Sequence, residues 1–303
     1  MLRREFLPCL AAAPLCAAPA GSILVHEHVL VDFIGAGEIR PGRYDPNEVF
    51  RLARPKLEEV KRLGCRRLQE CTPNFLGRDP KLLARLADAT GLEIWTNTGI
   101  YGAANHKYVP TFARSESAAE LARRWIAEAT VGLDGLRPRF IKTGVNRAPL
   151  HELDRKLVRA AAIASRETGL TIASHTSGGA AAVEQLDILA SEKVSPAKFV
   201  WVHAQNEKDH AFHARVAQAG AWVEFDGIRE ASHAWHLECL RFLAAGNLLE
   251  RALISQDSGW YRVGEPEGGD YRGYTWLYTH FLPALDPAWV GPLMRDHPVA
   301  AFG

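Results

Sequence analysis

The chain has 303 residues, of which 47% are hydrophobic and 23% are charged, and its net charge is +1. This length fits one (β/α)8 barrel, which typically takes about 250 residues. The near-neutral charge gives no reason to expect nucleic acid or an anionic membrane surface as a partner. No uninterrupted apolar run reaches the roughly 18 residues that a membrane span needs.

The N-terminus differs in composition from the rest of the chain. Arg3 and Arg4 precede an apolar, Ala-rich stretch that ends at Ala20. This pattern resembles a bacterial twin-arginine export signal with a small-residue cleavage site. We therefore expect a signal peptide over residues 1–20, one domain over residues 21–303, and a periplasmic or secreted protein. The alternative is an apolar N-terminal arm that frays.

The five cysteines are not expected to form disulfides. Cys9 and Cys16 lie in the expected signal peptide. Cys65 and Cys71 lie in one expected strand, where a rise of about 3.3 Å per residue holds them roughly 20 Å apart, too far to bridge. Cys239 then has no partner, so we expect free, buried thiols.

Eight apolar runs are typical of β-strands, and segments with helical periodicity lie between them. The expected strands cover residues 23–31, 65–71, 92–100, 139–146, 170–176, 198–204, 221–228 and 252–258. The clearest helical patterns cover residues 49–63, 79–90, 117–130 and 153–168. Alternation of strand and helix predicts an α/β fold with a parallel sheet, and eight units favour closure into a single (β/α)8 TIM barrel. The glycine-rich patterns of dinucleotide-binding and P-loop folds are absent from the sequence.

Glycines mark the ends of several helical patterns. Gly64, Gly91, Gly169, Gly220 and Gly246 each follow such a pattern and shortly precede an expected strand. Glycine is the usual residue where a helix stops in left-handed backbone. We therefore expect a positive φ at each of these five positions.

Six residues of metal-ligand type lie at the ends of expected strands. They are His26, His28, Lys142, His175, His203 and Asp257. A barrel of parallel strands brings the carboxyl ends of its strands to one face. Four imidazoles, one carboxylate and one lysine can hold two metal ions there, and this arrangement predicts metal-assisted hydrolysis.

His26 and His28 lie two residues apart on the first expected strand. Because side chains alternate along a strand, we expect both imidazoles on one face and the neighbours Val25 and Glu27 on the other. Two imidazoles on one face form a chelating pair. The H-x-H pattern is common by itself, and its position on the first of eight strands strengthens the metal-binding interpretation.

The other four positions each have a second interpretation. Lys142 lies in an apolar strand, where an unpaired ammonium is costly. It either pairs with an acid, reaches the barrel mouth with its charged end, or carries a carbamate formed with carbon dioxide that bridges two metals. His175 and His203 are either ligands or core histidines with satisfied hydrogen bonds. Asp257 ends a buried strand and needs a partner, which a metal supplies.

The ordered set resembles the phosphotriesterase family of the amidohydrolase superfamily. The matching segments are HEH on the first strand, Lys142 on the fourth, His175 on the fifth, His203 on the sixth and Asp257 on the eighth. The C-terminal HPVAAF is similar to the family's Asn-Pro-x-x-x-Phe, with His in place of Asn. The resemblance covers about residues 23–302.

This resemblance implies a binuclear site, with zinc expected from the His-rich ligand set. The HEH histidines and Asp257 would hold the more buried ion, and His175 and His203 the more exposed one. A carbamate on Lys142 and a hydroxide would bridge the two ions. The hydroxide would attack a phosphoryl or carbonyl centre, and Asp257 would position it and take its proton. The implied substrate is a small ester-type molecule: a lactone, a carboxylic ester or an organophosphate triester.

The chain departs from the lactonase branch of that family at two points. Gly227 stands where lactonases have an Arg shortly after the seventh strand, although Arg229 is close by. Gln256 stands before the aspartate of the eighth strand, where lactonases often have His. The lactonase-like Gly-Ile-Tyr that ends at Tyr101 is kept. The ester class is therefore left open.

Loops after the strands are expected to select the substrate. The loop after the third strand offers Tyr101, and the loop after the seventh offers Arg229. The longest loop follows the eighth strand, is rich in Gly and aromatics, and begins with Trp260 and Tyr261 after the aspartate. We expect these four residues to contact the substrate. The alternative is a solvated loop whose aromatics pack on the barrel rim.

Two other interpretations of the function stay open. One is a deaminase or metal-dependent nuclease, although related nucleases usually have Glu at the position of Lys142 and the charge argues against DNA. The other is a barrel that binds metal or ligand without turnover, although such a protein need not keep Asp257. The natural substrate, the metal in vivo and the oligomeric state, a homodimer included, stay open as well.

Overall fold

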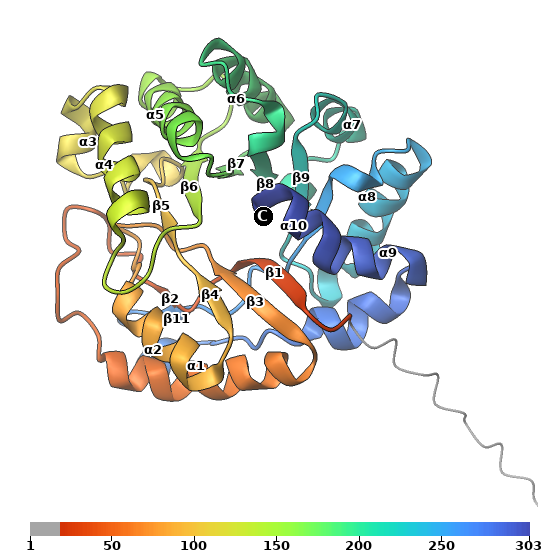
Figure 1. Ribbon diagram of the computed structural model, residues 1–303, viewed down its shortest axis with the longest axis horizontal. Helices are drawn as coiled ribbons and strands as arrows, with labels where there is room; N and C mark the ends of the chain where they lie inside the picture. The colour runs from red at the N-terminus through yellow and green to blue at the C-terminus, as the bar shows by residue number, and fades with distance from the viewer. Residues whose placement is uncertain (1–18) are drawn as a thin grey trace, which may run out of the picture.

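The computed structural model describes residues 19–303, so the predicted signal peptide at 1–20 lies outside the described residues except for its last two. Strands and helices alternate along the chain (Figure 1). The strands are β1 (Ser22–Glu27), β2 (Leu30–Val31), β3 (Cys65–Glu70), β4 (Glu93–Trp95), β5 (Asn97–Thr98), β6 (Phe140–Val145), β7 (Ile172–Thr176), β8 (Phe199–Val202), β9 (Trp222–Phe225), β10 (Ala252–Ile254) and β11 (Tyr261–Arg262). Each of the eight predicted strand segments therefore contains a strand.

Ten α-helices lie between and after the strands of the described region. They are α1 (Pro46–Arg62), α2 (Pro80–Thr90), α3 (Thr111–Ser115), α4 (Ala118–Val131), α5 (Glu152–Thr168), α6 (Gly179–Ser191), α7 (His210–Gln218), α8 (His233–Ala245), α9 (Pro287–Gly291) and α10 (His297–Phe302). The four clearest helical patterns of the sequence correspond to α1, α2, α4 and α5. Side-chain caps begin the first three: Asp45 and Asp79 each accept a backbone N–H in front of a proline, and Ser117 forms a capping box with Glu120.

The strands pair in parallel and follow one another in a ring. β1 pairs with β3 and β3 with β4, while β5 to β10 pair in sequence order. Thr96 lies between β4 and β5, and its carbonyl accepts the backbone N–H of Arg139. The backbone N–H of Asp257 donates to the carbonyl of His26 at 3.1 Å, which links the end of β10 back to β1. The result is an α/β fold whose helices surround a ring of parallel strands, as in TIM barrels (Figure 1). The short strands β2 and β11 pair separately.

Four of the five predicted left-handed glycines have a positive φ. The φ values are 100° at Gly64, 66° at Gly91, 75° at Gly169 and 90° at Gly220. The prediction for Gly246 is wrong, because its φ is −87° and the next residue, Asn247, takes the positive φ of 56°. Asparagine tolerates left-handed backbone better than most residues, so the reversal after α8 shifts by one position.

The apolar core has two layers, one between the strands and the helices and one inside the ring. The inner layer contains Val25, Phe140 and Val200. Helix α10 closes this layer at the amino ends of the strands, where the ring centres of Phe140 and Phe302 are 5.9 Å apart. The C-terminal HPVAAF segment therefore seals one end of the ring, and the carboxyl ends of the strands are left for the site.

The cysteine prediction is confirmed for the described part of the chain. Cys65, Cys71 and Cys239 are free and buried. Cys9 and Cys16 lie outside the described residues.

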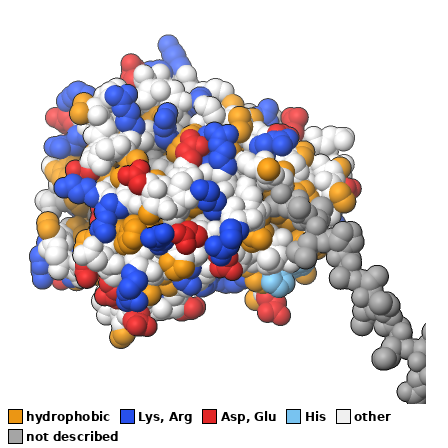
Figure 2. All heavy atoms as spheres, turned by 60° about the horizontal axis from the view of Figure 1, so that its bottom comes forward, with side chains coloured by type: hydrophobic (Ala, Val, Ile, Leu, Met, Phe, Trp, Pro, Cys, Tyr) orange, Lys and Arg blue, Asp and Glu red, His pale blue; other side chains and the backbone are white. Residues whose placement is uncertain are grey.

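The molecular surface carries both signs of charge. Figure 2 shows Lys and Arg side chains interspersed with Asp and Glu over the face that it draws, in line with the net charge of +1. Among residues 19–303, no helix combines the length and the apolar character needed to cross a bilayer.

Candidate metal centre

The structure brings all six predicted ligand residues to one cavity at the carboxyl ends of the strands. The cavity has a volume of about 200 Å³. Its lining includes His26, His28, Lys142, His175, His203 and Asp257, which we call the mouth cluster. The ring centres of His175 and His203 are 4.4 Å apart, and those of His26 and His203 are 5.0 Å apart. Residues on or just after separate strands thus lie close enough together to contact the same bound group.

A register shift in β1 lies beside His26, and both His26 and the following His28 line the cavity. The pairing of β1 with β3 is irregular between Leu24 and Glu27. Our expectation that Val25 faces away from His26 is wrong, since Val25 belongs to the apolar layer inside the ring. Glu27 does face away: its carboxylate accepts hydrogen bonds from the Ser255 hydroxyl and from two backbone N–H groups that follow β10. An irregularity of this kind re-aims side chains, here toward the site.

Two buried carboxylates on and after β9 orient two of the imidazoles. The Nδ1 of His26 lies 2.7 Å from an oxygen of Glu224, and the Nδ1 of His203 lies 2.6 Å from an oxygen of Asp226. Each Nδ1–H donates to its carboxylate, which leaves the Nε2 lone pair free for a ligand bond. Burial, together with the charge of Lys142, lowers the pKa of His26 to about 3, so this ring stays neutral.

Glu224 and Asp226 are not among the site residues predicted from the sequence. Burial and the neighbouring Asp226 raise the pKa of Glu224 well above its usual range. Burial opposes ionisation of Asp226 as well, but His203 and His26 lower its pKa well below the usual range. The available signal was two acids at alternate positions of an otherwise apolar strand, since buried acids need partners.

His28 is oriented by a chain of hydrogen bonds rather than by a direct carboxylate. Its Nδ1 lies 2.7 Å from the Thr72 hydroxyl oxygen. That hydroxyl lies 2.6 Å from an oxygen of Glu70 and 2.9 Å from the carbonyl of Leu30. Its one O–H donates to one of these two acceptors, and its oxygen accepts the His28 Nδ1–H. The Nε2 of His28 therefore presents its lone pair to the cavity.

Lys142 is buried without a partner. Its side chain is 2% exposed, and its Nζ makes no hydrogen bond to any described residue. The preceding strand approaches it closely: Gly99 has a φ of 121°, and a Cβ there would lie 2.1 Å from the carbonyl oxygen of Lys142. Only glycine fits at this contact. The environment of Lys142 therefore argues for a chemical partner that the protein chain does not supply.

Asp257 faces His26 on β1 and His28 just after it. Its Oδ1 lies 3.2 Å from Nε2 of His28 and 3.9 Å from Nε2 of His26. Burial raises the pKa of Asp257, but the neighbouring His28, His26 and His203 outweigh this and lower the pKa below the usual range. The carboxylate oxygen and the Nε2 of His28 thus face each other with lone pairs, a contact that a cation between them would stabilise.

The residues of the mouth cluster fit a metal ion. Ligand atoms of His26, His28 and Asp257 lie within 4.8 Å of one another. Lys142 Nζ and Asp257 Oδ1 are buried polar atoms without a hydrogen bond in the described residues. Imidazoles with hydrogen-bonded Nδ1 and an ionised carboxylate are usual ligands of first-row transition metals.

The walls of the cavity are largely aromatic. Phe33, Tyr101, Tyr108 and Trp260 line it, and the ring of Trp260 lies 4.8 Å from His28. Tyr101 meets His175 edge-on at 5.0 Å. Trp260 is fixed in left-handed backbone with a φ of 80°, and its Nε1 donates to the carbonyl of Asp257 at 2.9 Å. The predicted contacts Tyr101 and Trp260 are therefore placed beside the metal ligands.

Arg229 lies in a second, adjoining cavity of about 350 Å³. His175, His203 and Asp257 line both cavities, so the mouth cluster is open on two sides. Lys208 lines this cavity too, and the side that it shares with Arg229 is polar and basic. The structure thus places Arg229 in a different cavity from Trp260, and three residues of the mouth cluster line both cavities.

Tyr261 does not reach either cavity. It lies on β11 and is buried, and its hydroxyl donates to Glu48 of α1 at 3.0 Å. The predicted substrate contact for Tyr261 is therefore corrected to a packing role. The reason is the parallel pairing of β11 with β2, which turns Tyr261 away from its neighbour Trp260.

The phosphotriesterase family matches residues 10–291 of this sequence. The chain belongs to the phosphotriesterase family. This membership supports a metal-dependent hydrolase, and the mouth cluster contains residues that could hold a metal ion.

Two relatives and one solved structure are similar to most of the chain. It is 26% identical over 295 residues to the phosphotriesterase homology protein of Escherichia coli, which covers 94% of this chain and 98% of that protein. It is 27% identical over 209 residues to the aryldialkylphosphatase of Saccharolobus solfataricus, which covers 68% of this chain and 66% of that protein. The solved structure of a point mutant of organophosphorus hydrolase from Deinococcus radiodurans superposes with a TM-score of 0.83 at 28% identity, covering 95% of this chain and 94% of that one.

Proposed function

We propose that the protein is a binuclear metal-dependent hydrolase that attacks an ester-type bond. The observation that carries this proposal is the mouth cluster, in which four imidazoles, a lysine and an aspartate line one cavity. Two of its buried polar atoms, Lys142 Nζ and Asp257 Oδ1, have no hydrogen-bond partner among the described residues. A site left unsatisfied in this way is suited to ions that complete it.

The ligands divide into two sets. His26, His28 and Asp257 would hold one ion, and His175 and His203 the other, with a carbamate on Lys142 between them. Two divalent ions, zinc by preference, polarise the bond under attack and lower the pKa of the attacking water when they are bound. A carbamate would replace an unpaired buried ammonium by an anion with cations on both sides, which accounts for a lysine in this position.

Asp257 is the residue that we assign to proton transfer. Its pKa is held low by the neighbouring histidines, so the carboxylate is ionised and can accept a proton from the attacking water. Its backbone is fixed, because Trp260 Nε1 and an Arg272 N–H both donate to the Asp257 carbonyl at 2.9 Å. These contacts keep the carboxylate aimed at the cavity.

The two adjoining cavities suit different parts of one substrate molecule. The aromatic side beside Trp260 and Tyr101 suits an apolar group, and the basic side beside Arg229 suits a group that becomes anionic on cleavage. Lactones, carboxylic esters and organophosphate triesters each combine an apolar part with a leaving oxygen. We propose this ester class for the chain.

The test is a turnover panel on zinc-loaded protein. It contains lactones, aryl carboxylic esters and aryl phosphotriesters, with adenosine, cytidine and short DNA as probes for a deaminase or nuclease. Turnover of at least one ester type that chelation removes and zinc restores is the expected result. Turnover of only the nucleosides or DNA, or two bound ions with no turnover of any probe, would replace the proposal by another superfamily activity or by a binding barrel.

Export is a separate proposal, based on Arg3, Arg4 and the Ala-rich stretch that ends at Ala20. We propose that a twin-arginine pathway delivers the protein to the periplasm or beyond. The measurement is N-terminal sequencing of protein recovered from each fraction of its own host. Cleavage after Ala20 that is lost on replacing both arginines by lysine is expected, and cytoplasmic protein with an intact N-terminus would contradict it.

A further inference from the structure

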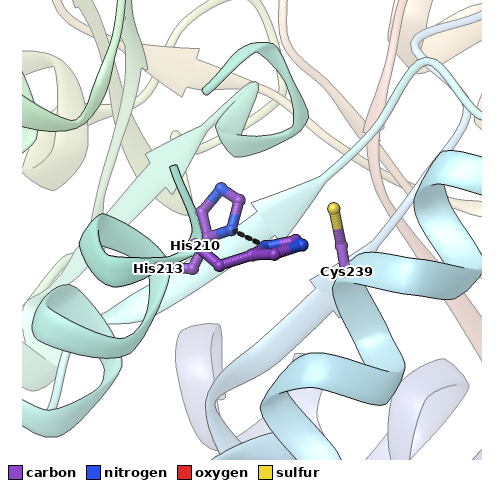
Figure 3. Close-up of side chains that lie close together, drawn as sticks. All are labelled: His210, His213 and Cys239. Atoms are coloured by element: carbon purple, nitrogen blue, oxygen red, sulfur yellow. Dashed lines mark hydrogen bonds between the residues drawn. The ribbon is translucent and has the colours of Figure 1, made fainter. Parts of the chain in front are cut away.

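A second group of ligand-type side chains meets between α7 and α8, outside the mouth cluster. His210 and His213 of α7 and Cys239 of α8 point into a common space (Figure 3). One ligand atom of each lies within 4.8 Å of the others. We call these three residues the interhelical cluster.

His213 already has the orientation of a metal ligand. It is fully buried, and its Nε2–H donates to the carbonyl of Ala204 at 2.8 Å. Its Nδ1 therefore carries the free lone pair. Burial lowers the pKa of His213 to about 4, so the ring is neutral near pH 7. A backbone carbonyl that fixes one ring nitrogen is what histidine ligands commonly have behind them.

His210 faces that lone pair. Its Nδ1 lies 3.0 Å from Nδ1 of His213, so either a proton or a cation must lie between the two nitrogens (Figure 3). Its Nε2 is buried and makes no hydrogen bond to a described residue, although an oxygen of Glu238 lies 3.5 Å away. The ring stacks on Trp235 and Phe242 with centres 5.0 and 4.5 Å away, which fixes its plane.

A cation in place of the shared proton would change these contacts in a favourable way. The proton of His210 would move from Nδ1 to Nε2, and the Nε2–H could then donate a hydrogen bond to the Glu238 carboxylate. Cys239 is fully buried, and burial raises the pKa of its thiol to about 12. Binding would replace the thiol proton, which is released to solvent, by a bond between sulfur and metal. Zinc–ligand bonds of about 2.0–2.3 Å place ligand atoms closer together than 4.8 Å, so small side-chain rotations complete the site.

We propose that His210, His213 and Cys239 form a metal site for a thiophilic cation of the Zn²⁺ or Cu⁺ type, separate from the mouth cluster. Two imidazoles and one thiolate select such cations over Mg²⁺ and Ca²⁺. The bound ion joins α7 to α8. It also fixes Ala204, the residue after the mouth ligand His203, through the His213 hydrogen bond. This site does not depend on the proposed hydrolase activity.

The test uses Co²⁺ as the probe on the metal-free, full-length protein. Thiolate bound to Co²⁺ gives a charge-transfer absorption in the near ultraviolet that imidazole and carboxylate ligands do not give. Cys239→Ser should abolish this absorption and lower the bound Co²⁺ by about one equivalent. Cys71→Ser is the matched control, because Cys71 is also buried but lines the mouth cavity. It should keep the absorption.

Three results would overturn the proposal: no thiolate absorption in the unaltered protein, absorption that survives Cys239→Ser, or absorption that Cys71→Ser removes. If Cys239→Ser does not fold, as judged by circular dichroism, Cys239→Ala replaces it with a small apolar side chain. The His210→Ala variant gives an independent readout, since it should shift the absorption and weaken Co²⁺ binding at least about tenfold while Cys239 stays in place. Ester turnover by the mouth cluster reports separately on the proposed function.

Discussion

The mouth cluster and the interhelical cluster both contain histidines, but different groups orient the histidines in each cluster. In the mouth cluster, His26 and His203 are held by the buried carboxylates of Glu224 and Asp226. In the interhelical cluster, His213 is held by a neutral backbone carbonyl. The first cluster opens onto two cavities, and the second lies between packed helices.

The difference shows what turnover requires beyond metal ligands. Histidines that face each other can hold an ion wherever two elements pack. Hydrolysis also needs an ionised carboxylate that faces a cavity and space for the substrate, and the mouth cluster has both. Changes at the mouth should therefore remove turnover, whereas Cys239→Ser should leave it nearly unchanged.

The largest effect is expected from Asp257→Asn. The amide cannot accept the proton of the attacking water, so kcat should fall by about 10²–10⁴-fold on every substrate. Steady-state kinetics on an aryl ester and a lactone measure this. Asp296→Asn, an exposed change beside Arg295, is the control and should be neutral. An Asp257→Asn enzyme with near-normal kcat would remove Asp257 from the mechanism.

Lys142→Ala should lose bound metal and, with it, most activity. If a carbamate bridges the ions, a short carboxylic acid such as propionate should enter the space left and restore part of both, as measured by elemental analysis and turnover. Lys81→Ala, at a lysine whose side chain is 75% exposed, should change neither. Full metal content in Lys142→Ala without added acid would contradict a bridging role.

Asp226→Asn tests whether this buried carboxylate, which was not predicted from the sequence, supports His203 as a metal ligand. The amide supports the Nδ1–H of His203 less well, so metal affinity should fall by about 10–100-fold, which is typical when such a partner is changed. Competition with a chelator measures this affinity. The interhelical cluster should keep its thiolate absorption, because His213 depends on Ala204 instead. Unchanged affinity would show that Asp226 does not tune the ligand.

The adjacent residues Trp260 and Tyr261 give the smallest and most selective contrast. Trp260→Ala removes one of the two hydrogen bonds to the Asp257 carbonyl, which lowers turnover of all substrates to the same degree, while Arg272 still donates to that carbonyl. Beyond this common loss, the variant should change the ranking of substrates while metal content stays the same, since Trp260 lines the mouth cavity. Tyr261→Phe should leave the ranking intact and cost about 1 kcal/mol of stability, the worth of its hydrogen bond to Glu48. Equal loss on all substrates in Trp260→Ala would reject its role in selectivity.

The pH dependence of Tyr261→Phe follows from the same hydrogen bond. Burial and Glu48 raise the pKa of Tyr261 from 10.0 to about 12. Because the unfolded chain loses this proton first, the contribution of Tyr261 to stability is present below pH 10 and is lost as the pH rises toward 12. Urea unfolding at several alkaline pH values should show a smaller decline for Tyr261→Phe than for the unaltered protein. An equal loss of stability in both proteins at alkaline pH would show that Tyr261 does not cause this pH dependence.

The order of elements and the gathering of the six mouth-cluster residues in one cavity could be predicted, because each depends on local pattern. Strand and helix periods alternate along the chain, and parallel strands bring their carboxyl ends together. The placement of Val25 could not be predicted, because it depends on an irregular pairing of β1 with β3. Tyr261 was misplaced for a similar reason, since the pairing of β11 with β2 decides its direction.

Other features depend on contacts between elements far apart in the sequence. Glu224 serves a histidine on β1, so its role becomes visible only when β9 and β1 share the ring interior. Cys239 meets His210 and His213 only because α8 packs beside α7. The family resemblance supplied the assignment of ligands to two ions, which residue spacing alone left open.

Anomalous diffraction at the zinc edge, from crystals of zinc-loaded protein, can locate metal ions in the mouth cavity. We expect two strong peaks there, one beside His26, His28 and Asp257 and one beside His175 and His203, with continuous density from Lys142 Nζ lying between them. A single peak, or two peaks with Lys142 as a free amine turned away from both, would contradict a binuclear centre bridged by this lysine.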